Sequence, residues 1–284
     1  MRTATILATN AHEGPTYVAD EDALYFTTLP RRPASGPPEV DIKRLVLDGS
    51  GPEVVVPGAH SNTANGMTLD RDGSILICEQ GSHARPARIS RLDRSTGTVE
   101  SVVAAFEGLP LNSPNDVVTR SDGTVWFTDP SYGYLQGFRP PPVLRDAVYR
   151  FDPATDALEM AADSLDKPNG LAFSPDERVL YVGDSGRPHH IKAFDVASDG
   201  ALRNERVFAV ITPGFPDGIE VDADGNVYSS SLRGVQVFSA AGAPLGEIAV
   251  PGAVNFTFGG PDRDVLFITA DDAIWAAYLN VKGA

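Results

Sequence analysis

The chain has 284 residues, 42% of them hydrophobic and 8% aromatic, and its formal net charge is −15. Such an acidic surface repels phosphate backbones and anionic lipid, which argues against nucleic acid or a membrane as a partner. The one cysteine, Cys78, cannot form an internal disulfide. Because the N-terminal stretch lacks the apolar run of a signal peptide and no window is long enough to cross a bilayer, we expect a cytoplasmic protein.

In chain order, an alternating segment near residues 4–9 comes first, and six hairpins of one kind follow it. Each hairpin opens with a small polar residue, reverses at an Asp/Gly turn and returns in a strand rich in β-branched and aromatic residues. The opening residues are Glu13, Asn65, Asn115, Asn169, Asp217 and Asn255, spaced 52, 50, 54, 48 and 38 residues apart. A unit of roughly 40 to 50 residues that recurs in this way is typical of a propeller.

Further alternating segments follow the hairpins, such as ARISRLD, AVYRFDP and IKAFDVA. Four short strands per repeat predict an all-β fold, a six-bladed β-propeller with four antiparallel strands per blade. We expect one domain over residues 1–284. The strand near residues 4–9 is expected to complete the last blade beside a final strand near 273–279, which leaves fewer exposed strand edges.

The hairpin geometry predicts which face of the propeller carries a site. An opening residue and the end of the second strand of its hairpin share one face of the disc. The first strand of a blade is innermost, so the six opening residues ring one mouth of the central channel. On this face we also expect Glu79 and three long loops, at 29–41, 81–88 (with His83) and 130–146. Long loops on a rigid scaffold are where function usually lies.

Four of the opening residues offer only oxygen ligands. Glu13 and Asp217 supply carboxylates, and Asn115 and Asn169 supply amide carbonyls. Hard cations prefer such donors, so we expect one divalent cation, Ca²⁺ first, with Mn²⁺, Mg²⁺ or Zn²⁺ as alternatives. Asn-Gly and Asp-Gly pairs are also common turn pairs. Six opening residues at equivalent positions of the repeats, two of them carboxylates that would be buried, favour a cation site over six ordinary turns.

Several longer stretches carry a resemblance to a known family. They include EGP at Glu13, NSPNDVVTRSDGTVWFTDPSYG at Asn112, KPNGLAFSPDERVLYVGDSG at Lys167 and PDGIEVDADGNVYSSS at Pro216. With these stretches in order along nearly its whole length, the chain resembles the gluconolactonase, regucalcin and luciferin-regenerating-enzyme family of six-bladed propellers.

The resemblance implies a cation at the propeller axis. By motif, its ligands would be Glu13 of EGP, Asn169 of PNG and Asp217 of PDG, with Asn115 of PND binding directly or through water. Some members of the family place an arginine two residues before the PND asparagine to hold substrate hydroxyls, and here Ser113 stands at that position.

The resemblance also implies a function, metal-dependent hydrolysis of small lactones by a sugar (aldono) lactonase. The cation would polarise the lactone carbonyl. Asp217 is the candidate to take the proton of the attacking water, and the alternative is that it only binds metal. We expect Asn65 and Asn115 to orient substrate oxygens, and Glu79 and His83 to line the pocket. Tyr132, Tyr134 and Phe138 of the 130–146 loop either form an apolar lid or anchor the loop.

Two other functions stay open on the sequence. One is a non-catalytic propeller that binds a ligand or a protein. The other is an esterase or phosphotriesterase that uses the same metal site. The sequence does not indicate the oligomeric state or the particular lactone.

Overall fold

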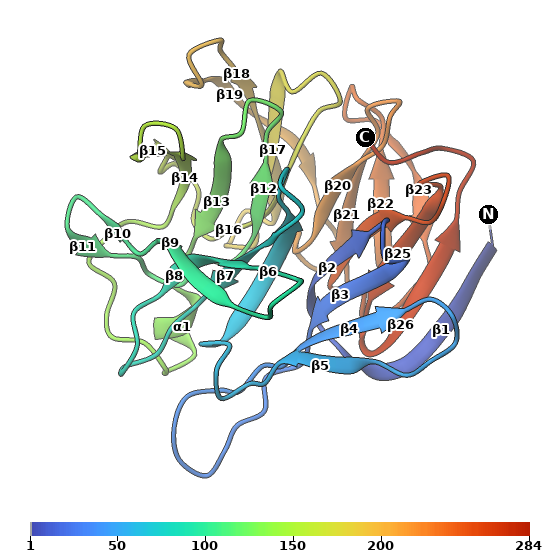
Figure 1. Ribbon diagram of the computed structural model, residues 1–284. Coiled ribbons are helices and arrows are strands. Elements are labelled where there is room, and N and C mark those ends of the chain that lie inside the picture. The colour runs from blue at the N-terminus through green and yellow to red at the C-terminus, as the bar shows by residue number, and fades with distance from the viewer. Residues whose placement is uncertain (1) are drawn as a thin grey trace.

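The computed structural model describes residues 2–284, and in this range the chain forms a ring of six four-stranded antiparallel sheets (Figure 1). The first strands of the six hairpins contact one another around the centre of the ring, and the later strands of each blade follow outward. The predicted fold class is therefore confirmed.

The strands of the first three blades are as follows. Blade one has β2 (Glu13–Val18), β3 (Ala23–Thr27), β4 (Ile42–Val46) and β5 (Glu53–Val56). Blade two has β6 (Ala64–Leu69), β7 (Ile75–Glu79), β8 (Arg88–Leu92) and β9 (Val99–Val103). Blade three has β12 (Val117–Thr119), β13 (Val125–Asp129), β14 (Ala147–Asp152) and β15 (Ala157–Ala162). Between blades two and three lies a small hairpin of β10 (Ala105–Phe106) and β11 (Leu109–Pro110).

The remaining blades repeat this order. Blade four has β16 (Pro168–Phe173), β17 (Val179–Asp184), β18 (His190–Val196) and β19 (Leu202–Val210). Blade five has β20 (Ile219–Val221), β21 (Val227–Ser231), β22 (Gly234–Phe238) and β23 (Pro244–Ile248). Blade six has β24 (Asn255–Gly259), β25 (Val265–Thr269), β26 (Asp271–Tyr278) and β1 (Arg2–Ala11).

The last blade is completed by the first strand of the chain. β1 pairs antiparallel with β26, from Arg2 opposite Tyr278 to Ala11 opposite Asp271. In Figure 1 the two lie side by side, the blue strand against the red one. The predicted closure is confirmed, and β1 extends beyond the expected residues 4–9 at both ends.

The core lies between neighbouring blades. β7, β13 and β25 are buried at every position because each blade is covered on both faces by the next ones. On the face of blade three that packs against blade two, for example, the ring of Phe127 stacks on that of Tyr149 with centroids 5.3 Å apart. Removal of this apolar surface from water is the main driving force for closing the ring.

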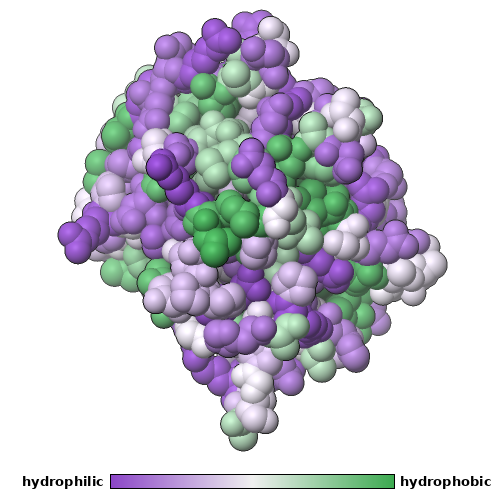
Figure 2. Space-filling model, turned by 90° about the vertical axis from the view of Figure 1, so that its left-hand side faces the viewer, coloured by the Kyte–Doolittle hydropathy of each residue, from purple (hydrophilic) through white to green (hydrophobic). Residues whose placement is uncertain are grey.

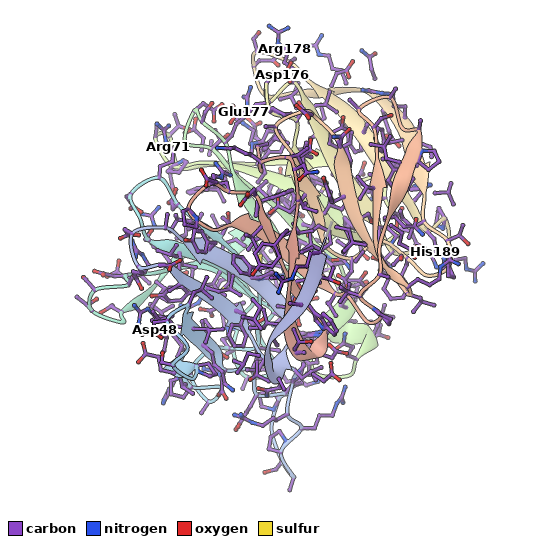
Figure 3. The ribbon with its side chains drawn as sticks, turned by 90° about the vertical axis from the view of Figure 1, so that its right-hand side faces the viewer. Asp48, Arg71, Asp176, Glu177, Arg178 and His189 are labelled. Carbon is purple, nitrogen blue, oxygen red and sulfur yellow. The ribbon has the colours of Figure 1, made fainter. Side chains whose placement is uncertain are left out.

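The two ends of the ring differ. The 29–41 loop and the short helix α1 (Tyr132–Leu135) lie toward the bottom of Figure 1, and the loop also projects from the bottom of the molecule in Figure 2, below a face of mixed hydrophobic and hydrophilic residues. The turn residues Asp176, Glu177 and Arg178 stand at the opposite end, at the top of Figure 3. No helix in residues 2–284 is long and apolar enough to cross a membrane.

Candidate active site

The glycine that follows several opening residues lets neighbouring blades approach closely. The N–H of Gly66 donates to the backbone oxygen of Asn115 at 2.8 Å, and that of Gly170 donates to the backbone oxygen of Asp217 at 2.9 Å. A Cβ on Gly66 would lie 2.5 Å from the Asn115 oxygen, and one on Gly170 would lie 2.1 Å from the Asp217 oxygen. These Asn-Gly pairs therefore connect blades instead of forming turns, and they hold the mouth residues in place.

Carboxylates at the ends of second strands hold the backbone just before the mouth residues. Asp129 accepts from the N–H groups of Asn112 and Ser113 at 2.8 and 2.7 Å, and Asp184 accepts from those of residues 166 and 167 at 2.9 and 2.8 Å. Burial raises the pKa of Asp129 to about 7, although these two amides oppose the shift. In both blades the strand-end aspartate therefore positions the segment that leads to the mouth asparagine.

Glu13, which is buried, and Asp217, which is half-buried, form an acidic pair at the mouth. The side chain of Glu13 is held by Asn255, whose Nδ2 donates to Oε2 at 2.8 Å. Burial raises the pKa of Glu13 well above its usual 4.5, and the negative charges of Asp217 and Asp116 raise it further. Burial also raises the pKa of Asp217, with the charge of His12 acting in the other direction. A bound cation would neutralise the pair and remove the repulsion between its charges.

The two asparagines leave their carbonyl oxygens available for a ligand. Asn115 Oδ1 is buried and has no hydrogen-bond partner in the described chain. Asn169 directs its Nδ2 to Ser185 Oγ at 2.9 Å and to Tyr132 Oη at 3.4 Å, which leaves its Oδ1. A buried carbonyl oxygen without a hydrogen-bond partner costs free energy, which a bound ligand would offset.

The donor set thus comprises two carboxylates and two amide oxygens, which fits a hard divalent cation. Residues 2–284 contain no group of three or more His, Cys, Asp or Glu arranged to hold a metal ion. This agrees with a site in which half of the side-chain donors are asparagines.

The other predicted site residues have different surroundings. Asn65 lies beside Asn115 in the ring, and its Nδ2 donates to the Asn115 backbone oxygen at 3.0 Å. Glu79 is buried, and both of its oxygens are engaged by Arg88 at 2.6 and 2.9 Å and by Asn62 at 2.9 Å. His83 is exposed in the 81–88 loop. Their predicted substrate contacts stay predictions, and the paired carboxylate of Glu79 is occupied within the protein.

Two further side chains reach the mouth. His12 precedes Glu13, and its Nδ1 lies 2.7 Å from Oδ1 of Asp271, a residue 259 positions away. Only the closure of β1 on β26 brings this pair together, so local sequence gave no signal for it. Tyr132 reaches Asn169 from α1. Phe138 of the same loop is buried and anchors it, whereas Tyr134 is 46% exposed.

A cavity of about 530 Å³ in the central channel opens at the end with the short turns. Its lining includes Thr16 and Glu220 from inner strands, Asp116 just before β12, and Pro175 from a turn. Burial raises the pKa of Asp116 to about 7 and that of Glu220 to about 8. We place the candidate site at the other end, where the long loops and the four oxygen donors lie.

Comparison with known proteins agrees with this geometry. Residues 11–272 match the SMP-30/Gluconolactonase/LRE-like region family. The chain belongs to this family. It is 33% identical over 251 residues to a gluconolactonase of Zymomonas mobilis, which covers 84% of this chain and 69% of that protein. It is 30% identical to a lactonohydrolase of Aspergillus oryzae, over 96% of this chain and 69% of that protein.

A solved structure extends the similarity to the whole chain. The structure of a gluconolactonase from Xanthomonas campestris superposes with a TM-score of 0.86 and 35% sequence identity. The match covers 100% of this chain and 90% of that one. The family resemblance inferred from the motifs is therefore confirmed.

Proposed function

We propose that this member of the family is a divalent-cation-dependent hydrolase of sugar lactones, with Glu13, Asn115, Asn169 and Asp217 as the side chains that hold the cation. The observation that carries the proposal is the acidic pair of the buried Glu13 and the half-buried Asp217, together with the unpaired amide oxygen of Asn115 at the mouth. Similarity to a gluconolactonase along the whole chain supports the choice of substrate.

A cation bound at this mouth supplies a Lewis acid that polarises the lactone carbonyl. As a water molecule adds to the carbonyl carbon, the Asp217 carboxylate takes its proton and later returns it to the ring oxygen, when the bond between that oxygen and the carbonyl carbon breaks. The product is an open-chain hydroxy acid. Asn65, whose Nδ2 is already committed to the backbone oxygen of Asn115, offers its carbonyl oxygen to a lactone hydroxyl.

The test is proton release in weak buffer on a panel of aldonolactones, alkyl lactones, aryl esters and phosphotriesters. The protein is stripped of metal and then given Ca²⁺, Mn²⁺ or Zn²⁺. Metal-dependent turnover of aldonolactones is expected. Turnover of the aryl esters or phosphotriesters alone would identify an esterase or phosphotriesterase, and a cation-binding protein without any turnover would be a binding propeller.

Two substitutions separate the roles of Asp217. Asp217→Asn keeps an oxygen ligand but removes one negative charge and the base, so we expect weaker cation binding and, at saturating cation, a kcat that falls roughly 10²- to 10⁴-fold. Asp217→Ala should lose both. The control is Asp176→Ala, at the opposite end of the ring (Figure 3). An undiminished kcat in Asp217→Asn would show that Asp217 is only a metal ligand.

A further inference from the structure

Tyr132 is the one side chain of α1 that reaches the mouth of the channel. It is half-buried, and its hydroxyl lies 3.4 Å from Nδ2 of Asn169, one of the four proposed cation ligands. A tyrosine from blade three thus closes over the asparagine of blade four.

The backbone on both sides of Tyr132 is held by Ser113. The fully buried Ser113 hydroxyl donates to the Pro130 oxygen at 2.6 Å and accepts from the Gly133 N–H at 2.9 Å. These bonds bracket Tyr132 in the sequence. Side chains held in this way lose little freedom when a ligand binds, which is the physical basis of preorganisation.

Arg139 anchors the same loop from beneath. Its guanidinium donates to the backbone oxygens of Asn112 at 2.8 Å, Leu111 at 2.7 Å and Ser82 at 3.0 Å. Gly133 lies so close to it that an added Cβ would be 2.3 Å from Arg139 Cγ. The 130–146 loop is therefore packed onto the segment that precedes Asn115 and onto the 81–88 loop.

The Tyr132 hydroxyl is a neutral donor in an acidic site. A tyrosine phenol is protonated near neutral pH and can donate its hydrogen. The Ser185 hydroxyl donates to the Pro216 oxygen at 2.5 Å, so its own proton is already used.

We propose that Tyr132 is a substrate-positioning residue whose hydroxyl donates a hydrogen bond to the hydroxyl group on the carbon next to the lactone carbonyl. This inference rests on the proposed function. The carbonyl oxygen of a lactone would dock at the cation that Asn169 helps to hold. Because Tyr132 touches that asparagine, the substrate oxygen within its reach is the one adjacent to the carbonyl. The site accordingly selects 2-hydroxylated lactones over 2-deoxy lactones.

The experiment compares the wild type with Tyr132→Phe, which removes one oxygen and keeps the ring. kcat/KM is measured on gluconolactone and on its 2-deoxy analogue, and the affinity for Ca²⁺ and Mn²⁺ is measured by calorimetry. We expect a loss of about 10- to 100-fold on gluconolactone and less than about threefold on the deoxy analogue, because a site built to bind a hydroxyl penalises its absence. Cation affinity should stay within about threefold.

Tyr134→Phe is the matched control, since Tyr134 lies exposed on the same helix. It should leave all of these values unchanged. An equal loss on both lactones, a fall in cation affinity, or no loss in Tyr132→Phe would each overturn the inference while leaving the proposed function intact. A wild type that hydrolyses no lactone with any cation would overturn both.

Discussion

Cation binding at the mouth should expel a proton from the pair of Glu13 and Asp217. The pKa of Glu13 lies well above 4.5 because the side chain is buried and faces a second carboxyl. A carboxylate must be deprotonated to bind a metal ion, so a divalent cation displaces any proton that the pair shares. We expect the wild type to release up to one proton per cation bound.

The substitution Glu13→Gln tests this in terms of energy. Two unit charges about 4 Å apart interact by about 4 kcal/mol at an effective dielectric constant of 20. Glutamine keeps an oxygen donor but not the negative charge. The substitution therefore removes much of the attraction between this side chain and the cation, and that attraction is larger for a divalent cation than for a single unit charge. The expected result is a fall in cation affinity of at least about 100-fold, equivalent to about 2.7 kcal/mol, and no proton release.

The assay is calorimetric titration of cation in two buffers with different ionisation enthalpies. The control is Glu220→Gln, which removes a carboxyl of raised pKa that lies in the channel cavity. It should change the affinity less than about threefold. Binding by the wild type without proton release, or unchanged affinity in Glu13→Gln, would refute the assignment of the pair as the cation site.

Two further predictions concern stability. Gly170→Ala would place a Cβ 2.1 Å from the Asp217 backbone oxygen. It should lower the free energy of unfolding by about 3 kcal/mol and weaken cation binding. Gly246→Ala, whose Cβ would have no atom within 4 Å, should do neither. Denaturant melts and calorimetry would show this, and equal effects of the two would contradict it. In chelator, folding raises the pKa of Asp116 to about 7 and that of Glu220 to about 8, so the native state binds protons more tightly than the unfolded chain. The resulting stability is complete below about pH 4 and is lost as pH rises through 7 and 8, so these groups lower the melting temperature by several degrees between pH 5 and 9. A melting temperature that rises across this window would contradict the assignment.

The parts of the molecule that could be predicted are those that repeat. The six opening residues occupy equivalent positions of the repeat, so the placement predicted for one applies to all. The order of the blades and the residues that line the mouth therefore follow from one hairpin geometry. The closure of β1 on β26 follows from the same repeat, because blade six lacks a fourth strand without it.

The parts that could not be predicted depend on contacts between distant segments. Nothing near His12 in the sequence indicates Asp271, and the reach of Tyr132 depends on how Ser113 holds the loop. Glu79 shares its strand-end position with Asp129 but is engaged by the side chain of Arg88, a residue nine positions away. Charge pairing of this kind requires the register of β7 against β8, which composition alone does not give.

The pairing of β1 with β26 also has a consequence for the order of events on the ribosome. Glu13 emerges early, but its partner Asn255 belongs to β24 and the β1 strand before it can pair only with β26. Contacts of such long sequence separation form late in folding. A nascent chain that has completed five blades therefore has an open ring and an incomplete cation site. Under the proposed function, cation affinity would appear only when the ring closes, so it would report closure of the ring as well as the presence of the site.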